Sequence, residues 1–222
     1  MDRIPLGCAA IDDMLGGGIE DGCVTLVYGE AGAGKTNFCL QMARNVAREG
    51  KKVAYVDTEG VSLDRLRQMC PDDFELVVRN ILFFEVHDFQ DQQQRVEGAI
   101  KLAESNPDIG LIVVDSMTMY YRLGSRDEER TVRNSLITQT EKLLTHARKN
   151  RIPVLLTSQV FTDIATGIYL ALGGHVIHHN AKTIIRLDKL AVGRRRAVIM
   201  KHRSLPEGRN AIFRLTDEGM VC

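Results

Sequence analysis

The residues best suited to chemistry form a glycine-rich stretch near the amino terminus. Residues 29–36 read Gly-Glu-Ala-Gly-Ala-Gly-Lys-Thr and match the phosphate-binding pattern completely. Small residues let such a backbone curl so that its N–H groups point at phosphate oxygens. Lys35 would reach the β- and γ-phosphates, and the Thr36 hydroxyl would enter the Mg²⁺ shell. We therefore predict a nucleoside triphosphate site with Mg²⁺; the alternative is a flexible surface turn.

Hydrophobic segments on both sides of this loop predict how it is held. The apolar run 24–28 ends at Gly29, and an amphipathic segment starts at Lys35 and meets a stop signal at Gly50. The loop would join a buried strand to a helix N-terminus, where the helix dipole also favours phosphate. The predicted nucleotide-binding residues are Gly29, Glu30, Ala31, Gly32, Ala33, Gly34, Lys35, Thr36 and Asn37.

Two acidic residues follow further predicted strands. Strand 51–57 leads to Glu59, and the apolar run 111–114 ends at Asp115. Ligands bind at the carboxyl ends of parallel strands. From spacing alone, Glu59 could orient the water that attacks the γ-phosphate, or belong to the cap of a helix over 63–69. Asp115 is predicted to hold a water of the Mg²⁺ shell, the alternative being a strand end that feeds a turn.

The remaining pattern predicts an α/β fold with a mostly parallel twisted sheet, flanking helices and antiparallel strands at the carboxyl end. A strand over 152–158 ends beside Gln159, whose neutral amide can hydrogen-bond a γ-phosphate without adding negative charge. The other predicted helices cover 9–15, a segment after 91, and 131–150; the other predicted strands cover 81–86, 182–189, 194–201 and 210–215.

These motifs together resemble the ATPase core of the RecA-type recombinases, in their archaeal and eukaryotic branch. A lead-in ending Leu-Gly-Gly-Gly-Ile at 15–19 precedes the loop as it does in that branch, and Asp-Thr-Glu-Gly at 57–60 matches its catalytic segment. The resemblance runs from about residue 4 to 220 and implies a RecA-like P-loop NTPase core that uses ATP and Mg²⁺. It assigns catalytic roles to Glu59, Lys35 and Gln159. The adenine-stacking arginine of the family is not assigned, because the segment before Arg65 is about one residue short.

The resemblance also divides the chain. We expect one ATPase core over 1–222, with a lead-in at 1–23, the nucleotide-binding part at 24–160, and a second DNA loop and antiparallel strands at 161–222. Gln159 would couple the ATP state to that loop, residues 161–174. Residues 161–172 contain no Lys or Arg, so this loop is suited to a protein partner as well as to DNA. Residues 174–180 are expected to enter a strand.

A first DNA-binding loop is implied between residues 116 and 133. Tyr121 could stack on a base. Acids at 127–129 keep open the alternative of a solvated helix start with ion pairs. Arginines 194–196 could serve DNA or simply charge an edge strand. The predicted DNA-binding residues are Arg122, Arg126, Arg130 and Arg133.

A contact with a neighbouring subunit is implied by the segment at 201–207. There Lys201 and Arg203 would supply cations to the γ-phosphate of the neighbour's ATP, and Pro206 would lie against its adenine. The alternative is a charged surface turn. We thus expect a possible homo-oligomer.

Composition sets limits on the class of protein. The 29 Lys and Arg balance the 29 Asp and Glu, so DNA contacts must come from local patches. We expect the five cysteines to be reduced thiols, because their spacing shows no pairs. His87 and the histidines at 175, 178 and 179 lack the companions of a zinc site. No leader or membrane span is seen, so we expect a cytoplasmic protein.

The function that the resemblance implies is that of a recombinase paralog built of the ATPase core alone. Such a protein would bind ATP and single-stranded or branched DNA, hydrolyse ATP weakly, lack strand exchange and assist the main archaeal recombinase of the RadA type. We expect a protein that consists of this core, without the helical DNA-binding domain and docking linker of that branch. One alternative is an active DNA-dependent recombinase. Another is a KaiC-like signalling ATPase, which the single glutamate at 59 disfavours.

Overall fold

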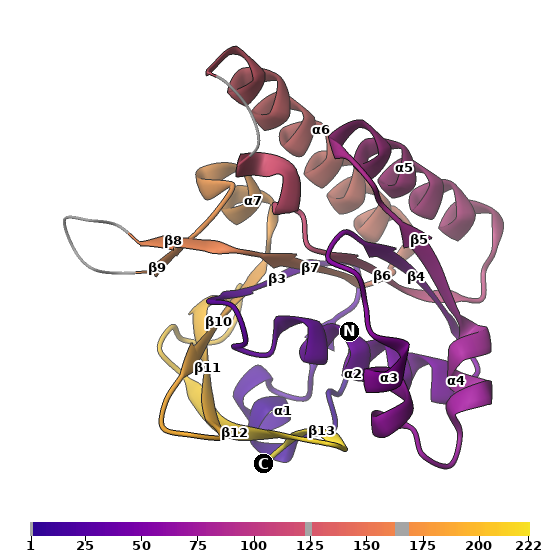
Figure 1. The fold of residues 1–222 in the computed structure, drawn as a ribbon, viewed down its shortest axis with the longest axis vertical. Coiled ribbons are helices and arrows are strands. Elements are labelled where there is room, and N and C mark those ends of the chain that lie inside the picture. The colour runs from indigo at the N-terminus through magenta and orange to yellow at the C-terminus, as the bar shows by residue number, and fades with distance from the viewer. Residues whose placement is uncertain (1, 123–125, 163–168) are drawn as a thin grey trace.

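One large sheet organises the part of the chain that the computed structural model describes, residues 2–122, 126–162 and 169–222 (Figure 1). Within those ranges, nine strands run in the order β13-β12-β11-β10-β3-β7-β6-β4-β5. These strands are β3 Val24–Gly29, β4 Lys52–Asp57, β5 Ile81–Glu85, β6 Ile109–Asp115, β7 Val154–Ser158, β10 Thr183–Lys189, β11 Arg194–Lys201, β12 Asn210–Thr216 and β13 Gly219–Val221. Two short ribbons pair β1 Arg3–Ile4 with β2 Ile19–Glu20 and β8 Val160–Thr162 with β9 Tyr169–Ala171.

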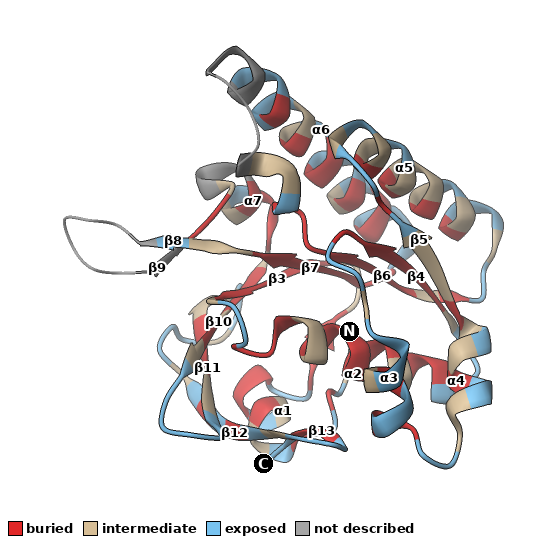
Figure 2. Cartoon of the chain, viewed as in Figure 1, coloured by how far each residue is buried: buried red, intermediate tan, exposed pale blue. Residues whose placement is uncertain are grey.

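Helices cover both faces of this sheet. On one side lie α1, α2, α3 and α4, and on the other α5, α6 and α7 (Figure 1). The bounds are α1 Ala9–Leu15, α2 Lys35–Arg48, α3 Leu63–Met69, α4 Phe74–Asn80, α5 Phe89–Ser105, α6 Arg126–Asn150 and α7 Gly174–Asn180, with a 3₁₀ turn at Met119–Arg122. The central strands are buried on both faces, as Figure 2 shows, which is why their sequences are almost continuously apolar. The predicted α/β class with a RecA-like arrangement is confirmed.

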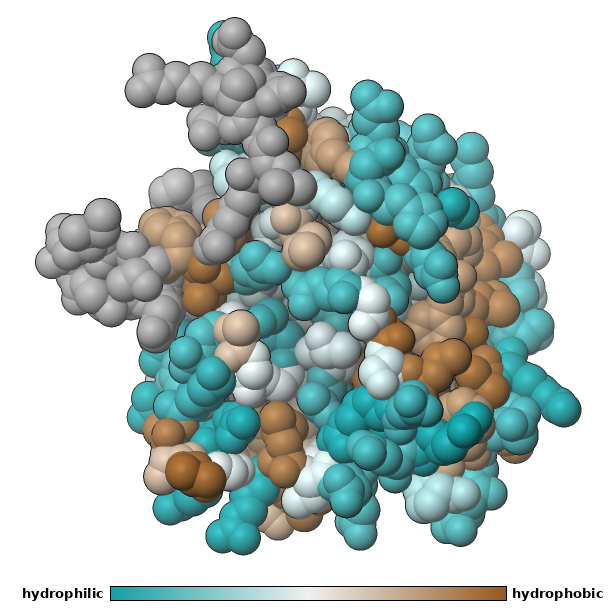
Figure 3. Space-filling view, in the orientation of Figure 1, coloured by the Kyte–Doolittle hydropathy of each residue, from teal (hydrophilic) through white to brown (hydrophobic). Residues whose placement is uncertain are grey.

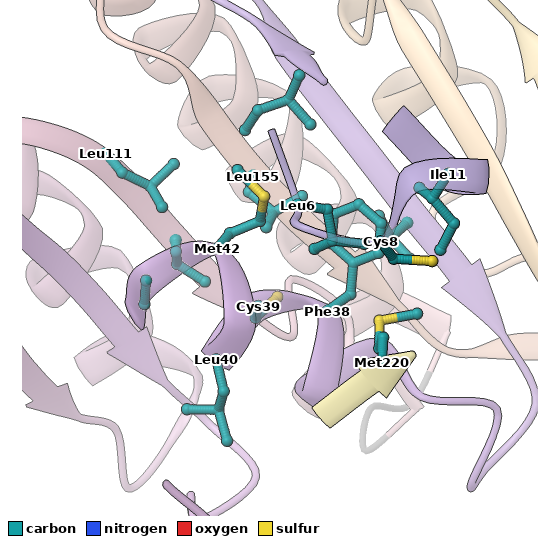
Figure 4. Close-up of a cluster of buried hydrophobic side chains, with 14 of the residues drawn as sticks. Leu6, Cys8, Ile11, Phe38, Cys39, Leu40, Met42, Leu111, Leu155 and Met220 are labelled. Carbon is teal, nitrogen blue, oxygen red and sulfur yellow. The ribbon is translucent and has the colours of Figure 1, made fainter. Parts of the chain in front are cut away.

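The hydrophobic core under α2 binds the two ends of the chain to the phosphate loop. Phe38 of α2 lies beside Leu6 and Cys8, with Met220 of β13 close by (Figure 4). Phe38 and Leu6 are fully buried. The helix that begins in the loop is therefore fixed by packing against the start and the end of the chain.

Several predicted elements need correction. Strand β10 pairs antiparallel with β11 but parallel with β3, so it is the last parallel strand rather than the first antiparallel one. Strand β13 was not predicted. Residues 174–180 form helix α7 rather than a strand entry, after Gly173 in the left-handed conformation. Helix α6 begins at Arg126, five residues before the predicted start at 131, because acids at 127–129 favour a helix N-terminus. Helix α5 begins at Phe89, since the Asp88 side chain caps it through the Asp91 N–H.

The predicted loop at 161–174 begins and ends in an antiparallel hairpin. Val160 pairs with Ala171 and Phe161 with Leu170, and residues 163–168 lie outside the described ranges.

The expectation of five reduced cysteines is wrong. Cys8 and Cys222 form a disulfide between the start of α1 and the end of the chain, 214 positions apart, whereas Cys23, Cys39 and Cys70 are buried free thiols. In the described part of the chain, none of the helices has the length and apolar character needed to span a membrane.

Candidate nucleotide site

The phosphate loop occupies the turn between β3 and α2. Gly32 and Gly34 have φ angles of 73° and 109°, which residues with a side chain rarely adopt. Gly29 allows a close approach of another strand, because a Cβ there would lie 2.4 Å from the Leu187 carbonyl oxygen of β10. The loop is therefore a glycine-dependent curve supported by the neighbouring parallel strand.

Lys35 lies inside this curve. Its Nζ donates to the carbonyl oxygens of Gly29 and Glu30, at 3.0 and 3.2 Å. Burial lowers the pKa of Lys35, and the nearby Glu59 and Asp115 carboxylates oppose that shift. Among the described residues the hydrogen bonds of Lys35 go only to these two neutral carbonyls, and a triphosphate would supply a directly bonded anion.

The loop forms one wall of a cavity of about 430 Å³. The cavity also contains Glu59, which follows β4, and Gln159, which follows β7. Gln159 Nε2 donates to Glu59 Oε1 at 3.2 Å, although 100 positions separate the two residues. The residues that line the cavity are Gly29, Glu30, Ala31, Gly32, Gly34, Lys35, Thr36, Asn37, Glu59, Gln159 and Val160. Parallel strands thus bring together the residues that were predicted to act on ATP.

Hydrogen bonds to the Asp57 side chain hold the turn that carries Glu59 to this cavity. The Asp57 carboxylate accepts the backbone N–H groups of Glu59, Gly60 and Val61, at 3.1, 2.9 and 2.6 Å. Ser62 separately caps α3 by accepting the Arg65 N–H. Asp57 and Ser62 therefore bond the free backbone N–H groups before and at the start of α3. The Glu59 side chain is not needed as a helix cap and is available to the cavity.

Asp115 ends β6 and is fully buried. It accepts hydrogen bonds from the hydroxyls of Tyr55, at 3.0 Å, and Thr157. Burial raises the pKa of Asp115, and hydrogen bonds from Thr157, Thr36 and Tyr55 partly offset the rise. A carboxylate beside the Thr36 hydroxyl at the base of the phosphate loop fits the few protein ligands that Mg²⁺ takes next to a triphosphate. Thr36 and Asp115 would therefore hold that ion.

Sequence reasoning missed Tyr55 and Thr157. Both are polar side chains next to buried apolar residues of β4 and β7, the strands that flank β6. Such isolated polar positions in buried strands were the available signal, because a buried hydroxyl needs a partner.

Gln159 connects the cavity to the β8–β9 hairpin. Its backbone N–H donates to Thr118 Oγ1 at 3.0 Å, and its carbonyl accepts the Leu172 N–H at 2.8 Å. Ser158 Oγ reinforces the junction by donating to the Leu172 carbonyl at 2.9 Å. A change at the Gln159 side chain therefore has a short covalent and hydrogen-bonded route to the hairpin.

The predicted DNA-binding residues fall into two groups. Arg130 and Arg133 are exposed on α6. The side chains of Arg122 and Arg126 lie outside the described part of the structure. Tyr121 is half-buried and packs against the core beneath α5 and α6, which does not favour base stacking.

Two arginines of the basic triplet at 194–196 have partners within the fold. Arg196 forms an ion pair with Asp188, at 2.9 Å, and Arg195 Nε donates to the Gly32 carbonyl at 3.2 Å. Arg195 therefore supports the outer side of the phosphate loop.

The cations of the segment at 201–206 also have partners inside the chain. Lys201 Nζ donates to the His178 and Ala181 carbonyls that end α7, at 2.7 and 2.8 Å. Arg203 Nε lies 2.9 Å from Oε2 of the buried Glu20. Within the described residues, Arg203 therefore has an anionic partner, whereas Lys201 bonds to neutral carbonyls. Contact with a neighbour's ATP stays a prediction, as does the role of the exposed Pro206.

This segment begins toward the opposite end of β10 from the phosphate loop of its own chain. Lys201 pairs with Ile184, near the start of β10, whereas Gly29 pairs with Leu187 near its end.

The described residues contain no group of three or more His, Cys, Asp or Glu side chains that could hold a metal ion.

Comparisons with known proteins identify similar chains. A sequence model described as Rad51 matches residues 1–221. The DNA repair and recombination protein RadB of Methanococcoides burtonii is 42% identical over 221 residues, which are 99% of this chain and 97% of that protein. RadB of Archaeoglobus fulgidus is 40% identical over 219 residues, 98% of this chain and 97% of that one. A solved structure described as the crystal structure of the RadB recombinase is 36% identical, with a TM-score of 0.85 and 99% of both chains covered.

Proposed function

Because this chain belongs to the Rad51 family, we propose that it binds ATP and DNA and acts in homologous recombination and DNA repair. The observation that carries the proposal is the cavity in which Lys35, Glu59 and Gln159 meet the phosphate loop. Relatives described as DNA repair and recombination proteins support the biological role. The whole chain would act as one ATPase core in the cytoplasm.

The residues of the cavity divide the work on ATP. Backbone N–H groups of the loop and the Lys35 cation would bind the β- and γ-phosphates. Bound Mg²⁺ would neutralise phosphate charge, and Thr36 and Asp115 would hold it. Glu59 would orient the attacking water and accept its proton, and Gln159 would contact the γ-phosphate.

We expect this hydrolysis to be weak. One oxygen of the Glu59 carboxylate already accepts a hydrogen bond from Gln159 at 3.2 Å, so Gln159 competes with an attacking water for that acceptor. The segment 161–172 lacks Lys and Arg, which favours an accessory role over strand exchange. ATP turnover measured with and without single-stranded DNA tests this. A turnover like that of a fast motor ATPase, or a strong rise with DNA, would support an active recombinase instead.

DNA binding is expected to depend on a few arginines at the start of α6. Replacing the exposed Arg130 and Arg133 together with Ala should weaken binding to single-stranded DNA. It should also reduce the log–log salt slope by about 1.4, since each contact with a single strand contributes about 0.7. Fluorescence anisotropy at several salt concentrations measures both effects.

The matched control removes two exposed cations at the other end of the same helix, Arg148 and Lys149. That variant keeps the change in net charge identical but should leave the slope unaltered. If both double variants gave the same slope, the contact would be a general charge effect and this site would be wrong.

Assembly is proposed to involve a full-length archaeal recombinase of the RadA type or a second copy of this chain. Strand β5 pairs only with β4 among the described strands and so offers an open edge. Leu76 of α4 is 52% exposed beside it, and hydrophobic surface gathers on that side of the molecule in Figure 3. An open edge with apolar side chains suits an added strand from a partner.

The contact in trans gives an assembly test. The variant Lys201→Ala/Arg203→Ala should lose ATP-dependent association with the recombinase in a pull-down. Arg209→Ala is the control, because this cation of the same loop is bound to the Asp13 carbonyl. Thermal unfolding must accompany the test, since Lys201 and Arg203 also stabilise α7 and Glu20. Association that ignores both the nucleotide and the substitutions would contradict the shared site.

A further inference from the structure

Arg65 of α3 lies where three elements meet beside the nucleotide cavity. Its Nε donates to Asn37 Oδ1 of α2 at 2.8 Å. One terminal nitrogen donates to the Thr216 carbonyl at 2.6 Å, at the turn between β12 and β13, and the other contacts Gln68 Oε1 at 3.2 Å. The guanidinium is therefore fixed in orientation by α2, α3 and the carboxyl-terminal hairpin.

This arrangement decides which way the Asn37 amide points. A guanidinium only donates hydrogen bonds, so the atom of Asn37 that faces Arg65 must be the oxygen. The Nδ2 group is then the branch left for other partners, and no acceptor for it is found among the described residues. Asn37 is half-buried and lines the cavity two positions after Lys35. A partly buried amide with its oxygen occupied and its NH₂ unpaired is a donor that awaits an acceptor.

We propose that Arg65 is a positioning residue that turns the NH₂ group of Asn37 toward the bound nucleotide, where it donates to a phosphate or ribose oxygen. The inference rests on the proposed ATP site and adds a contact that the phosphate-loop pattern does not specify. Arg65 touches no substrate atom and acts through Asn37. The same guanidinium bonds the Thr216 carbonyl, so the position of the β12–β13 turn is linked to the amide.

Calorimetric titration with ATP and Mg²⁺ tests the proposal as a double-mutant cycle. Asn37→Ala should weaken binding about tenfold, the effect of losing a hydrogen bond to a charged or strongly polar oxygen. Arg65→Ala should weaken it about fivefold, because the amide is then free to rotate. The double variant should be no weaker than Asn37→Ala, since Arg65 has no effect once its target is gone. Losses that simply multiply would show a general structural role for Arg65 and overturn the proposal.

Two further variants sharpen the result. Asn37→Asp keeps the bond to Arg65 but replaces the donor with an anionic oxygen, so it should bind ATP more weakly than Asn37→Ala. Equal or tighter binding would contradict the assigned amide orientation. Arg67→Ala is the matched control, since this arginine of the same helix lies over the Phe74 ring, 4.6 Å from its centroid, and should leave affinity unchanged.

The acceptor is identified with 2′-deoxy- and 3′-deoxy-ATP. If the penalty of Asn37→Ala disappears with one of them, the missing hydroxyl oxygen is the acceptor; if it persists with both, a phosphate oxygen is. The variant Lys35→Ala distinguishes a failure of the proposed ATP site from a failure of the Arg65–Asn37 contact. If Lys35→Ala abolishes binding while Asn37→Ala does not alter it, only the inference fails. If Lys35→Ala binds ATP normally, the proposed site itself fails.

Discussion

Replacing Lys35 with alanine is expected to weaken ATP binding by on the order of a hundredfold, the upper range for loss of a charged hydrogen-bonded partner. This ammonium is buried and, among the described residues, donates hydrogen bonds to the Gly29 and Glu30 carbonyls alone. Burial lowers its pKa, and phosphate oxygens would favour its charged form. The binding energy of the triphosphate is therefore expected to depend strongly on this one cation.

Calorimetry on the parent and Lys35→Ala measures the effect directly. Lys142→Ala is a suitable control, because this lysine is exposed on α6 and paired with Glu97 at 2.6 Å, away from the cavity. Thermal unfolding without nucleotide should change little in Lys35→Ala, since removing a buried cation also removes its desolvation cost. A variant that binds ATP as tightly as the parent would refute the nucleotide site.

Local sequence patterns predicted the site better than its surroundings. The β3–loop–α2 unit follows from one short motif and its flanking apolar runs, so its bounds were predicted closely. Asp115 was found because it ends an apolar strand. The hydroxyls that hold it come from β4 and β7, and only the strand order places them beside it. Contacts that depend on strand order are not encoded in any local pattern.

The same limit applies at the carboxyl end of the chain. From the sequence, Lys201 and Arg203 were interpreted as contacts to a neighbouring subunit or as a charged surface turn, because their partners, the end of α7 and Glu20, are distant along the chain. Gln41 of α2 is a polar residue outside the apolar pattern by which this helix was predicted, but its side chain is buried, with 1% exposed. Its side chain bonds the Leu6 and Met220 carbonyls, which joins both ends of the chain to α2. Polar residues that serve as long-range connectors resemble surface residues until the fold is known.

Replacing Glu59 with glutamine is expected to lower ATP turnover by about a hundredfold or more, within the range for loss of a general base. Glutamine has nearly the same shape and can still meet the Gln159 amide, now 3.2 Å from the Glu59 carboxylate. It cannot accept the proton of the attacking water. ATP binding should persist, because the substitution removes a negative charge near the triphosphate rather than a ligand of it.

The experiment pairs single-turnover hydrolysis with calorimetry on the same samples. Glu85→Gln is the matched control, because Glu85 ends the neighbouring strand β5, pairs in register with Asp57 and is exposed. That variant should keep both turnover and affinity. If Glu59→Gln kept the parent turnover, another group or the solvent would supply the base, and the catalytic role of Glu59 would be wrong. If it lost turnover and affinity together, Glu59 would act mainly by shaping the cavity, with Asp57 and Gln159 as its neighbours in that task.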